Sequence, residues 1–405
     1  MSASASLAGL VRQRSVVICC GPGGVGKTTV AATFGLEAAR QGRRACVVTV
    51  DPARRLADAL GVESLPNTPA VVPGDWPGEL HALMLDAAGT FDDLVRRYAR
   101  TPEQAADIQA NRLYKNLAGA LSGTQEYMAM EKLYELTERG DYDVVVVDTP
   151  PTRNALDLLD APRRLTHFLE NRLFRALLAP TRAYLRALNV ATRALLRTIS
   201  KVAGAEIVQD AVAFFQSFQG MEQGFHDRAG AVRALLADPS TAYVLVTSPR
   251  ADAVAEAEFF AGKLADTGIE PAALVVNRVH PHVGRVGVAM PAAPPGTALA
   301  ALVDNLELLE DLARREDTAY AELARRLAPA PVGRVPLLGS DVHDLNGLGD
   351  VADQLFGALG TPGAAASPGA GSPPAAASAP APAPPPGGAP AAHRPEPSGG
   401  GGGLG

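Results

Sequence analysis

The segment Ser15–Thr28, which reads SVVICCGPGGVGKT, is the strongest indication of the fold in the sequence. A run of β-branched and small apolar residues leads into a glycine-rich turn, and the turn ends in Lys-Thr. This order matches the phosphate-binding pattern G-x-x-x-x-G-K-[S/T], which connects a strand to a helix. Helix-favouring residues continue from Thr29 to Arg40, as the pattern requires. The sequence therefore predicts a P-loop at the carboxyl end of a buried strand.

The P-loop pattern predicts roles for single residues. Its glycines let backbone N–H groups turn toward phosphates, and the start of the following helix adds positive potential. We expect Lys27 to reach the β- and γ-phosphates, the Thr28 hydroxyl to bind Mg²⁺, and Thr29 to contact the α-phosphate. The residues predicted to contact the nucleotide are Gly21, Gly23, Gly24, Val25, Gly26, Lys27, Thr28 and Thr29. The alternative is a glycine-rich turn that binds nothing, and the flanking strand and helix argue against it.

Two aspartates follow other apolar runs. Asp148 ends Val144–Asp148, and Asp51 comes directly after Ala45–Val50. The carboxyl ends of parallel strands meet at one edge of a sheet, so both can converge on the P-loop. We expect Asp148 to share the Mg²⁺ site with Thr28, and Asp51 to act with Lys27 in catalysis by orienting or deprotonating the attacking water. Both aspartates could instead cap the turns that follow them, and for Asp51 the two roles are compatible.

Strand-like and helix-like segments alternate along the chain, which predicts a doubly wound, mostly parallel α/β sheet. Two segments, 90–140 and 156–236, read as helical, and we expect them to form one helical subdomain inserted in the sheet domain. A further helix pair is expected near 298–327. The expected strands are Ser15–Cys20, Ala45–Val50, Leu80–Leu85, Asp143–Asp148, Tyr243–Thr247 and Ala273–Asn277.

Composition separates a tail from the rest of the chain. Residues 361–405 contain 13 Ala, 12 Pro and 11 Gly, which leaves little to build a core. We therefore expect one P-loop domain over 1–360 and a disordered tail over 361–405. A net charge of −6 gives no general basic field for nucleic acid, and three cysteines cannot form a disulfide framework. Without a signal peptide or a long apolar run, the protein is predicted to be cytoplasmic.

Taken together, these segments resemble the ArsA/GET family of deviant P-loop ATPases, over about Arg14 to Gly357. Asp51–Ala59 looks like the family switch I, and Asp148–Thr152 looks like switch II. Asn277 resembles the family residue that reads adenine, and Pro336, within Val335–Leu338, resembles the late adenine-side loop. The stretches Leu121–Tyr127 and Thr149–Ala161 are most similar to an actinobacterial branch in which two ArsA-like proteins are thought to work as a pair.

The resemblance implies a P-loop NTPase fold of the SIMIBI type and a Mg²⁺-dependent ATPase. It also implies a homodimer, or a heterodimer with a second ArsA-like ATPase, in which the nucleotide state controls closure and the binding of a client or membrane-protein partner. Two alternatives stay open. One is a nucleotide-binding regulatory subunit with little turnover. The other is a ParA/MinD-like positioning ATPase, which the large helical insertion disfavours.

Pro22 departs from the family pattern. It stands where the family usually has a signature Lys that reaches the nucleotide of the partner subunit, and proline supplies no charge and no N–H. We therefore expect slow hydrolysis alone, or hydrolysis assisted by a partner that contributes its own Lys. The cysteine pairs that some members use for zinc or arsenite are also absent, which disfavours a metalloid pump.

The segment 161–201 is the most basic part of the chain, with nine basic residues and one acidic residue. If it is helical, four of its arginines fall within an arc of about 60°. This face could bind an acidic partner, an anionic lipid surface, or a hydrophobic client or membrane-protein partner. It could also be the solvated side of an ordinary amphipathic helix. The four arginines are Arg182, Arg186, Arg193 and Arg197.

Overall fold

The computed structural model describes residues 6–51, 53–112, 114, 124–150, 213, 214, 216, 217, 220–283 and 294–357. All of them belong to one compact unit, Met1–Gly360, and a second unit comprises Thr361–Gly405. The predicted disordered tail, the basic segment 161–201 and most of the segment 156–236 lie outside the described residues.

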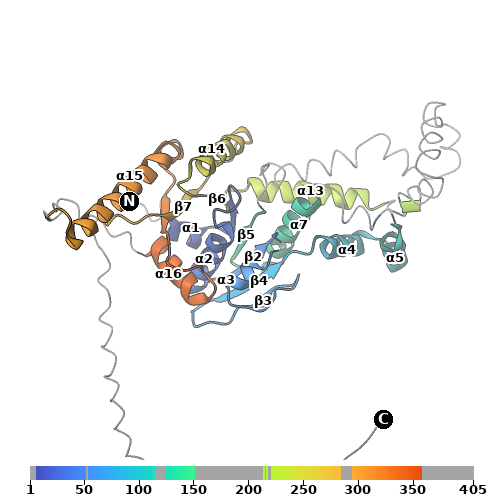
Figure 1. Cartoon of the computed structure of the whole chain (residues 1–405). Coiled ribbons are helices and arrows are strands. Elements are labelled where there is room, and N and C mark those ends of the chain that lie inside the picture. The colour runs from blue at the N-terminus through green and yellow to red at the C-terminus, as the bar shows by residue number, and fades with distance from the viewer. Residues whose placement is uncertain are drawn as a thin grey trace, which may run out of the picture. The chain divides into compact units, whose positions relative to one another are not determined.

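A single sheet forms the centre of the first unit, with the strand order β3-β4-β2-β5-β1-β6-β7-β8 (Figure 1). Neighbouring strands run parallel, except that β3 is antiparallel to β4. This order confirms the predicted doubly wound, mostly parallel sheet. The strands are β1 (Val16–Cys20), β2 (Arg44–Thr49), β3 (Ala70–Val71), β4 (Glu79–Met84), β5 (Val144–Asp148), β6 (Thr241–Thr247), β7 (Ala273–Val279) and β8 (Val332–Pro336).

The apolar run of β5 shows how the sheet is buried. Val144 and Val146 belong to the hydrophobic cluster on one face of the sheet, and Val145 and Val147 belong to the cluster on the other face. A strand that is covered on both sides needs apolar residues at every position, because successive side chains point to opposite faces.

Helices cover both faces of the sheet. The first cluster includes residues of α1 (Leu7–Gln13), α2 (Lys27–Arg40), α3 (Arg55–Ala59) and α16 (Leu345–Phe356). The second includes residues of α7 (Thr124–Arg139), α13 (Glu222–Ala237), α14 (Ala251–Asp266) and α15 (Ala298–Arg326). The prediction of a helix pair near 298–327 is wrong: α15 is one helix of 29 residues, and its sequence contains no Gly or Pro that would break it.

A third hydrophobic cluster lies mainly among helices. It joins α4 (Ala87–Tyr98) and α5 (Pro102–Ala110) to one end of α7 and of α13. The predicted helical character of 90–140 is thus confirmed in the described part of that segment, and α13 is the described end of the segment 156–236. In the part of the chain that the structure describes, no helix is both long and apolar enough to span a membrane.

Candidate functional site

The P-loop connects β1 to α2 at the middle of the sheet, and its backbone conformation requires glycine. Gly21 and Gly26 have φ angles of 144° and 90°, in the region that disfavours residues with a side chain. A Cβ on Gly21 would overlap the backbone carbonyl of Val246, and a Cβ on Gly26 would overlap the amide nitrogen of Asn277. These contacts place the loop against β6 and β7.

Lys27 begins α2 and is buried, with 6% of its surface exposed. Its Nζ donates a hydrogen bond of 2.8 Å to the backbone carbonyl of Pro22, across the loop. Burial lowers the pKa of Lys27, while Asp148 and other nearby acidic groups oppose this shift. Pro22 therefore contacts Lys27 through its backbone, and its ring contributes no charge to the loop.

Asp148, at the end of β5, lies at the base of the P-loop and is 1% exposed. Its Oδ2 accepts hydrogen bonds from the hydroxyl of Thr28, at 2.7 Å, and from that of Thr49, at 2.9 Å. Burial raises the pKa of Asp148 to about 6, although both hydrogen bonds and Lys27 favour the charged form. A hydroxyl beside a carboxylate is the kind of oxygen donor set that Mg²⁺ uses when it keeps most of its water ligands.

Asp51 follows β2, and its carboxylate is held on both oxygens. Oδ1 accepts the N–H of Ala53 at 3.0 Å, and Oδ2 lies 3.2 Å from the guanidinium of Arg55. The structure gives Arg54, not Asp51, as the N-cap of α3. The carboxylate of Asp51 thus supports the turn that leads into α3, and its side chain keeps 14% of its surface exposed toward the cavity in front of the P-loop.

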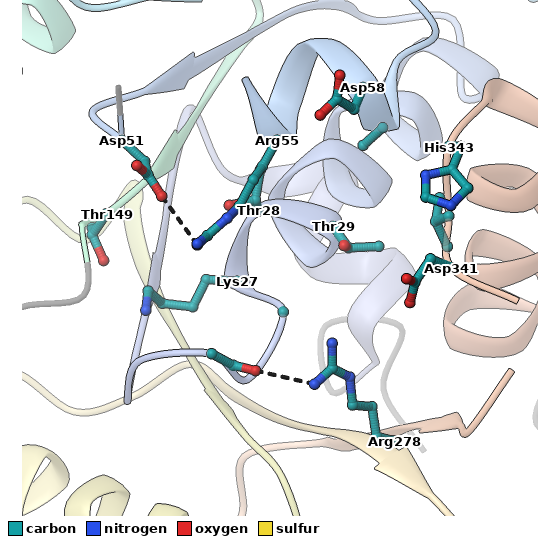
Figure 2. Close-up of a pocket in the computed structure, with 14 residues that line it drawn as sticks. Lys27, Thr28, Thr29, Asp51, Arg55, Asp58, Thr149, Arg278, Asp341 and His343 are labelled. Atoms are coloured by element: carbon teal, nitrogen blue, oxygen red, sulfur yellow. Dashed lines mark hydrogen bonds and ion pairs between the residues drawn. The ribbon is translucent and has the colours of Figure 1, made fainter. Parts of the chain in front are cut away.

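This cavity has a volume of about 420 Å³ (Figure 2). It brings together six of the residues predicted for the site, namely Gly24, Gly26, Lys27, Thr28, Thr29 and Asp51. Gly21, Gly23, Val25, Asp148, Asn277 and Pro336 do not line it. The other lining residues are Arg55, Asp58, Ala59, Thr149, Arg278, Asp341, Val342 and His343.

The two residues predicted to lie on the adenine side, Asn277 and Pro336, belong to β7 and β8. Asn277 is buried in β7, and its amide nitrogen donates a hydrogen bond of 2.8 Å to the carbonyl of Val25. Pro336 ends β8, next to Val279 of β7. The family resemblance implied a loop over Val335–Leu338, and this is wrong for the first two residues, which belong to β8. The contact of Asn277 and Pro336 with adenine stays a prediction.

Arg278, Asp341 and His343 are cavity residues that the sequence reasoning missed. Arg278 lies in β7, and the other two residues follow β8; the positions of both strands relative to the P-loop depend on the order of strands in the sheet. The sequence contains one indication of them, which is that they lie close to predicted site residues. Arg278 follows Asn277, and the other two come shortly after Pro336. No periodicity or motif distinguishes them.

The three cysteines are free and buried in β1 and β2 of the sheet. Burial raises the pKa of both Cys20 and Cys46 to about 12, so these thiols are unreactive. Among the described residues, no group of three or more His, Cys, Asp or Glu side chains could hold a metal ion.

The chain matches one family model and is similar to several known proteins. The model of the family described as anion-transporting ATPases (ArsA) matches residues 14–285. An uncharacterized protein of Streptomyces coelicolor is 34% identical over 66% of this chain and 63% of its own length. The ATPase get3 of Aspergillus terreus is 29% identical over 39% and 46%. A putative arsenical pump-driving ATPase of Aquifex aeolicus is 22% identical over 84% and 78%. The chain thus spans less than two thirds of the first two relatives.

Proposed function

Because the chain belongs to the ArsA family of anion-transporting ATPases, we propose that it binds ATP with Mg²⁺ in the cavity in front of the P-loop and hydrolyses it. Family membership agrees with the resemblance found in the sequence. The observation that carries the proposal is the convergence of Lys27, Thr28 and Asp51 on one cavity, with Asp148 hydrogen-bonded to Thr28. Asp51 and Asp148 come from the carboxyl ends of two parallel strands, and Lys27 and Thr28 from the start of one helix.

The chemistry that this arrangement supports is transfer of the γ-phosphoryl group to water. The P-loop N–H groups and Lys27 bind the phosphates and stabilise the charge that develops on them. Thr28 and Asp148 would hold Mg²⁺, which neutralises charge on the β- and γ-phosphates when bound. Asp51 orients the attacking water and accepts its proton as the bond between the γ-phosphorus and the ADP oxygen breaks.

Nucleotide state is proposed to control two segments that each contribute lining residues to the cavity. Asp51–Leu56 and Asp148–Thr152 would be ordered by contacts to the γ-phosphate and released on hydrolysis. We further propose that this change closes a homodimer, or a heterodimer with a second ArsA-like ATPase. Closure would alter the binding of a client or membrane-protein partner. The basic segment 161–201 supports a partner surface by its composition.

A single-turnover assay of ATP hydrolysis with Asp51→Asn tests the proposed activity. We expect the rate to fall by about 100-fold or more, because general base catalysis contributes about that factor, while ATP binding is retained. Asp58→Asn is the matched control, because Asp58 lines the same cavity and the charge change is the same. Equal rates for the wild type and Asp51→Asn would contradict the role given to Asp51.

One observation favours a second candidate, a nucleotide-binding regulatory subunit with little turnover. Pro22 brings no cation to the phosphate loop, and a lost charge near the transferred phosphoryl group lowers the rate by orders of magnitude. ATP binding without single turnover in the isolated protein would support this candidate. A gain in rate on mixing with a paralogue that carries the Lys would instead support assisted hydrolysis.

A further inference from the structure

Arg278 has an unusual backbone conformation. Among the described residues it alone, apart from glycines, has a positive φ, of 62°. The pairing of β7 with β8 shifts register between Asn277 and Val279, which marks a bulge at this position. Arg278 is exposed, while both neighbours are buried. Bulges of this kind redirect a side chain and are frequent beside active sites.

The P-loop and the bulge are fixed to each other by Asn277. Its Oδ1 accepts the N–H of Arg278 at 2.9 Å, and its amide nitrogen donates to the carbonyl of Val25 at 2.8 Å. The left-handed conformation is disfavoured for a residue with a side chain, so these hydrogen bonds hold it in place. The position of the Arg278 side chain is therefore tied to the phosphate loop.

The bulge directs the guanidinium of Arg278 to the cavity. Its Nη1 donates to the carbonyl of Gly24 at 3.3 Å, and Figure 2 shows it on the side of the P-loop away from Asp51 and Arg55. Arg55 is paired with Asp51, whereas Arg278 forms no ion pair with any residue that the structure describes. A guanidinium has five N–H donors, and one carbonyl contact leaves most of them for a ligand.

We propose that Arg278 binds a phosphate group of the nucleotide in this cavity, as a second cation beside Lys27. The inference rests on the proposed ATP binding and adds a residue to that site. Arginine suits phosphate because its planar fork can donate two parallel hydrogen bonds. In this chain the P-loop position of Pro22 carries no charge, and Arg278 brings a cation to the same loop from β7.

Binding of ATP, ADP and adenosine to the full chain, measured by calorimetry at several salt concentrations, tests the role of Arg278. Arg278→Asn removes the charge and tolerates a left-handed backbone. We expect it to weaken ATP and ADP binding by about 10-fold or more, to leave adenosine binding unchanged and to reduce the salt dependence of ATP affinity. Arg278→Lys keeps the charge without the fork and should bind ATP with intermediate affinity.

Two results would overturn this inference while leaving the proposed function standing. In the first, Arg278→Asn binds ATP with the affinity and salt dependence of the wild type, while Lys27→Ala, measured in the same series, loses ATP binding. The other is an equal loss of ATP and adenosine affinity, which would indicate that Arg278 only supports the bulge. If Arg278→Asn fails to fold, Arg278→Gly replaces it, because glycine adopts the same φ freely. Failure of the wild type to bind ATP would overturn the proposed function, and this inference with it.

Discussion

The junction of Gly26 and Asn277 shows how single residues place the nucleotide site. Gly26 is the N-cap of α2, with a left-handed backbone. The side chain of Asn277 occupies the space where a Cβ of residue 26 would lie, and its amide nitrogen holds the carbonyl of Val25. The last turn of the P-loop is therefore shaped by a side chain from β7, more than two hundred residues later in the chain.

Substituting Gly26 with alanine should damage both stability and nucleotide binding. The new Cβ must displace Asn277, and the alanine must also adopt a disfavoured φ. A left-handed alanine alone costs about 1 kcal/mol, and we expect the free energy of unfolding to fall by well over that amount. Gly268→Ala is the matched control, because Gly268 has a φ of 78° and a Cβ added there would meet no atom within 4 Å. Thermal unfolding and ATP titration compare them, and equal effects in both variants would contradict the role of the Asn277 contact.

The residues of the candidate site were predictable from sequence only where a motif fixes their spacing. Lys27, Thr28 and Thr29 follow from the P-loop pattern, and Asp51 follows from its place at the end of a strand. Arg278 and His343 could not be found this way. Their positions depend on a bulge in β7 and on the path of the chain after β8, and both are set by tertiary packing.

At the scale of elements, a buried ion network joins α7 to α13. Arg228 of α13 is 4% exposed, and it donates to Glu131 at 2.6 Å and to Glu138 at 2.7 Å. Its guanidinium also lies over the ring of Tyr134, 4.1 Å from the centroid. Burial raises the pKa of Glu131, and Arg228 opposes this shift. The network connects the helix that precedes β5 to the helix that precedes β6.

Replacing Arg228 with methionine should lower the free energy of unfolding by about 3–5 kcal/mol, because Glu131 would be left buried without its partner. The double variant with Glu131→Met should recover much of this loss, since it removes the unpaired charge. Arg325→Met is the control, because its pair with Glu322 is exposed and should contribute little to the free energy of unfolding. Urea unfolding measures all three, and a change below about 1 kcal/mol for Arg228→Met alone would refute the expected role.

The elements that the sequence predicted are those with a strong local pattern. The apolar runs of β1, β2 and β4 to β7 mark strands buried on both faces, and each lies within a few residues of its expected bounds. The edge strands were missed. β3 has two residues, and β8 contains a glycine, an exposed arginine and a proline. An edge strand has one neighbour, so it needs no continuous apolar run and resembles a loop in sequence.

At the scale of the whole molecule, the alternation of strands and helices was sufficient to predict the sheet, and the strand order explains where the site lies. β1 lies between β5 and β6. Strands β2 to β5 lie on one side of β1 and strands β6 to β8 on the other, so the order in which strands are added to the sheet changes sides at the strand that carries the P-loop. Ligands of open parallel sheets bind at such a point. Which helices cover which face was not predictable, because a strand buried on both sides carries the same apolar residues toward each.

The three hydrophobic clusters predict how much of the chain the domain needs. All of their described members lie before residue 357, and α16 supplies Leu348, Val351 and Leu355 to the first cluster. A chain ending at Gly360 should therefore keep the melting temperature and ATP affinity of the full chain. A chain ending at Asp344 removes α16 and the edge-to-face contact between Phe356 and Phe34, and each large buried side chain lost costs about 2–5 kcal/mol. It should unfold or melt far lower. Equal destabilisation of both truncations would show that 361–405 contributes to the fold.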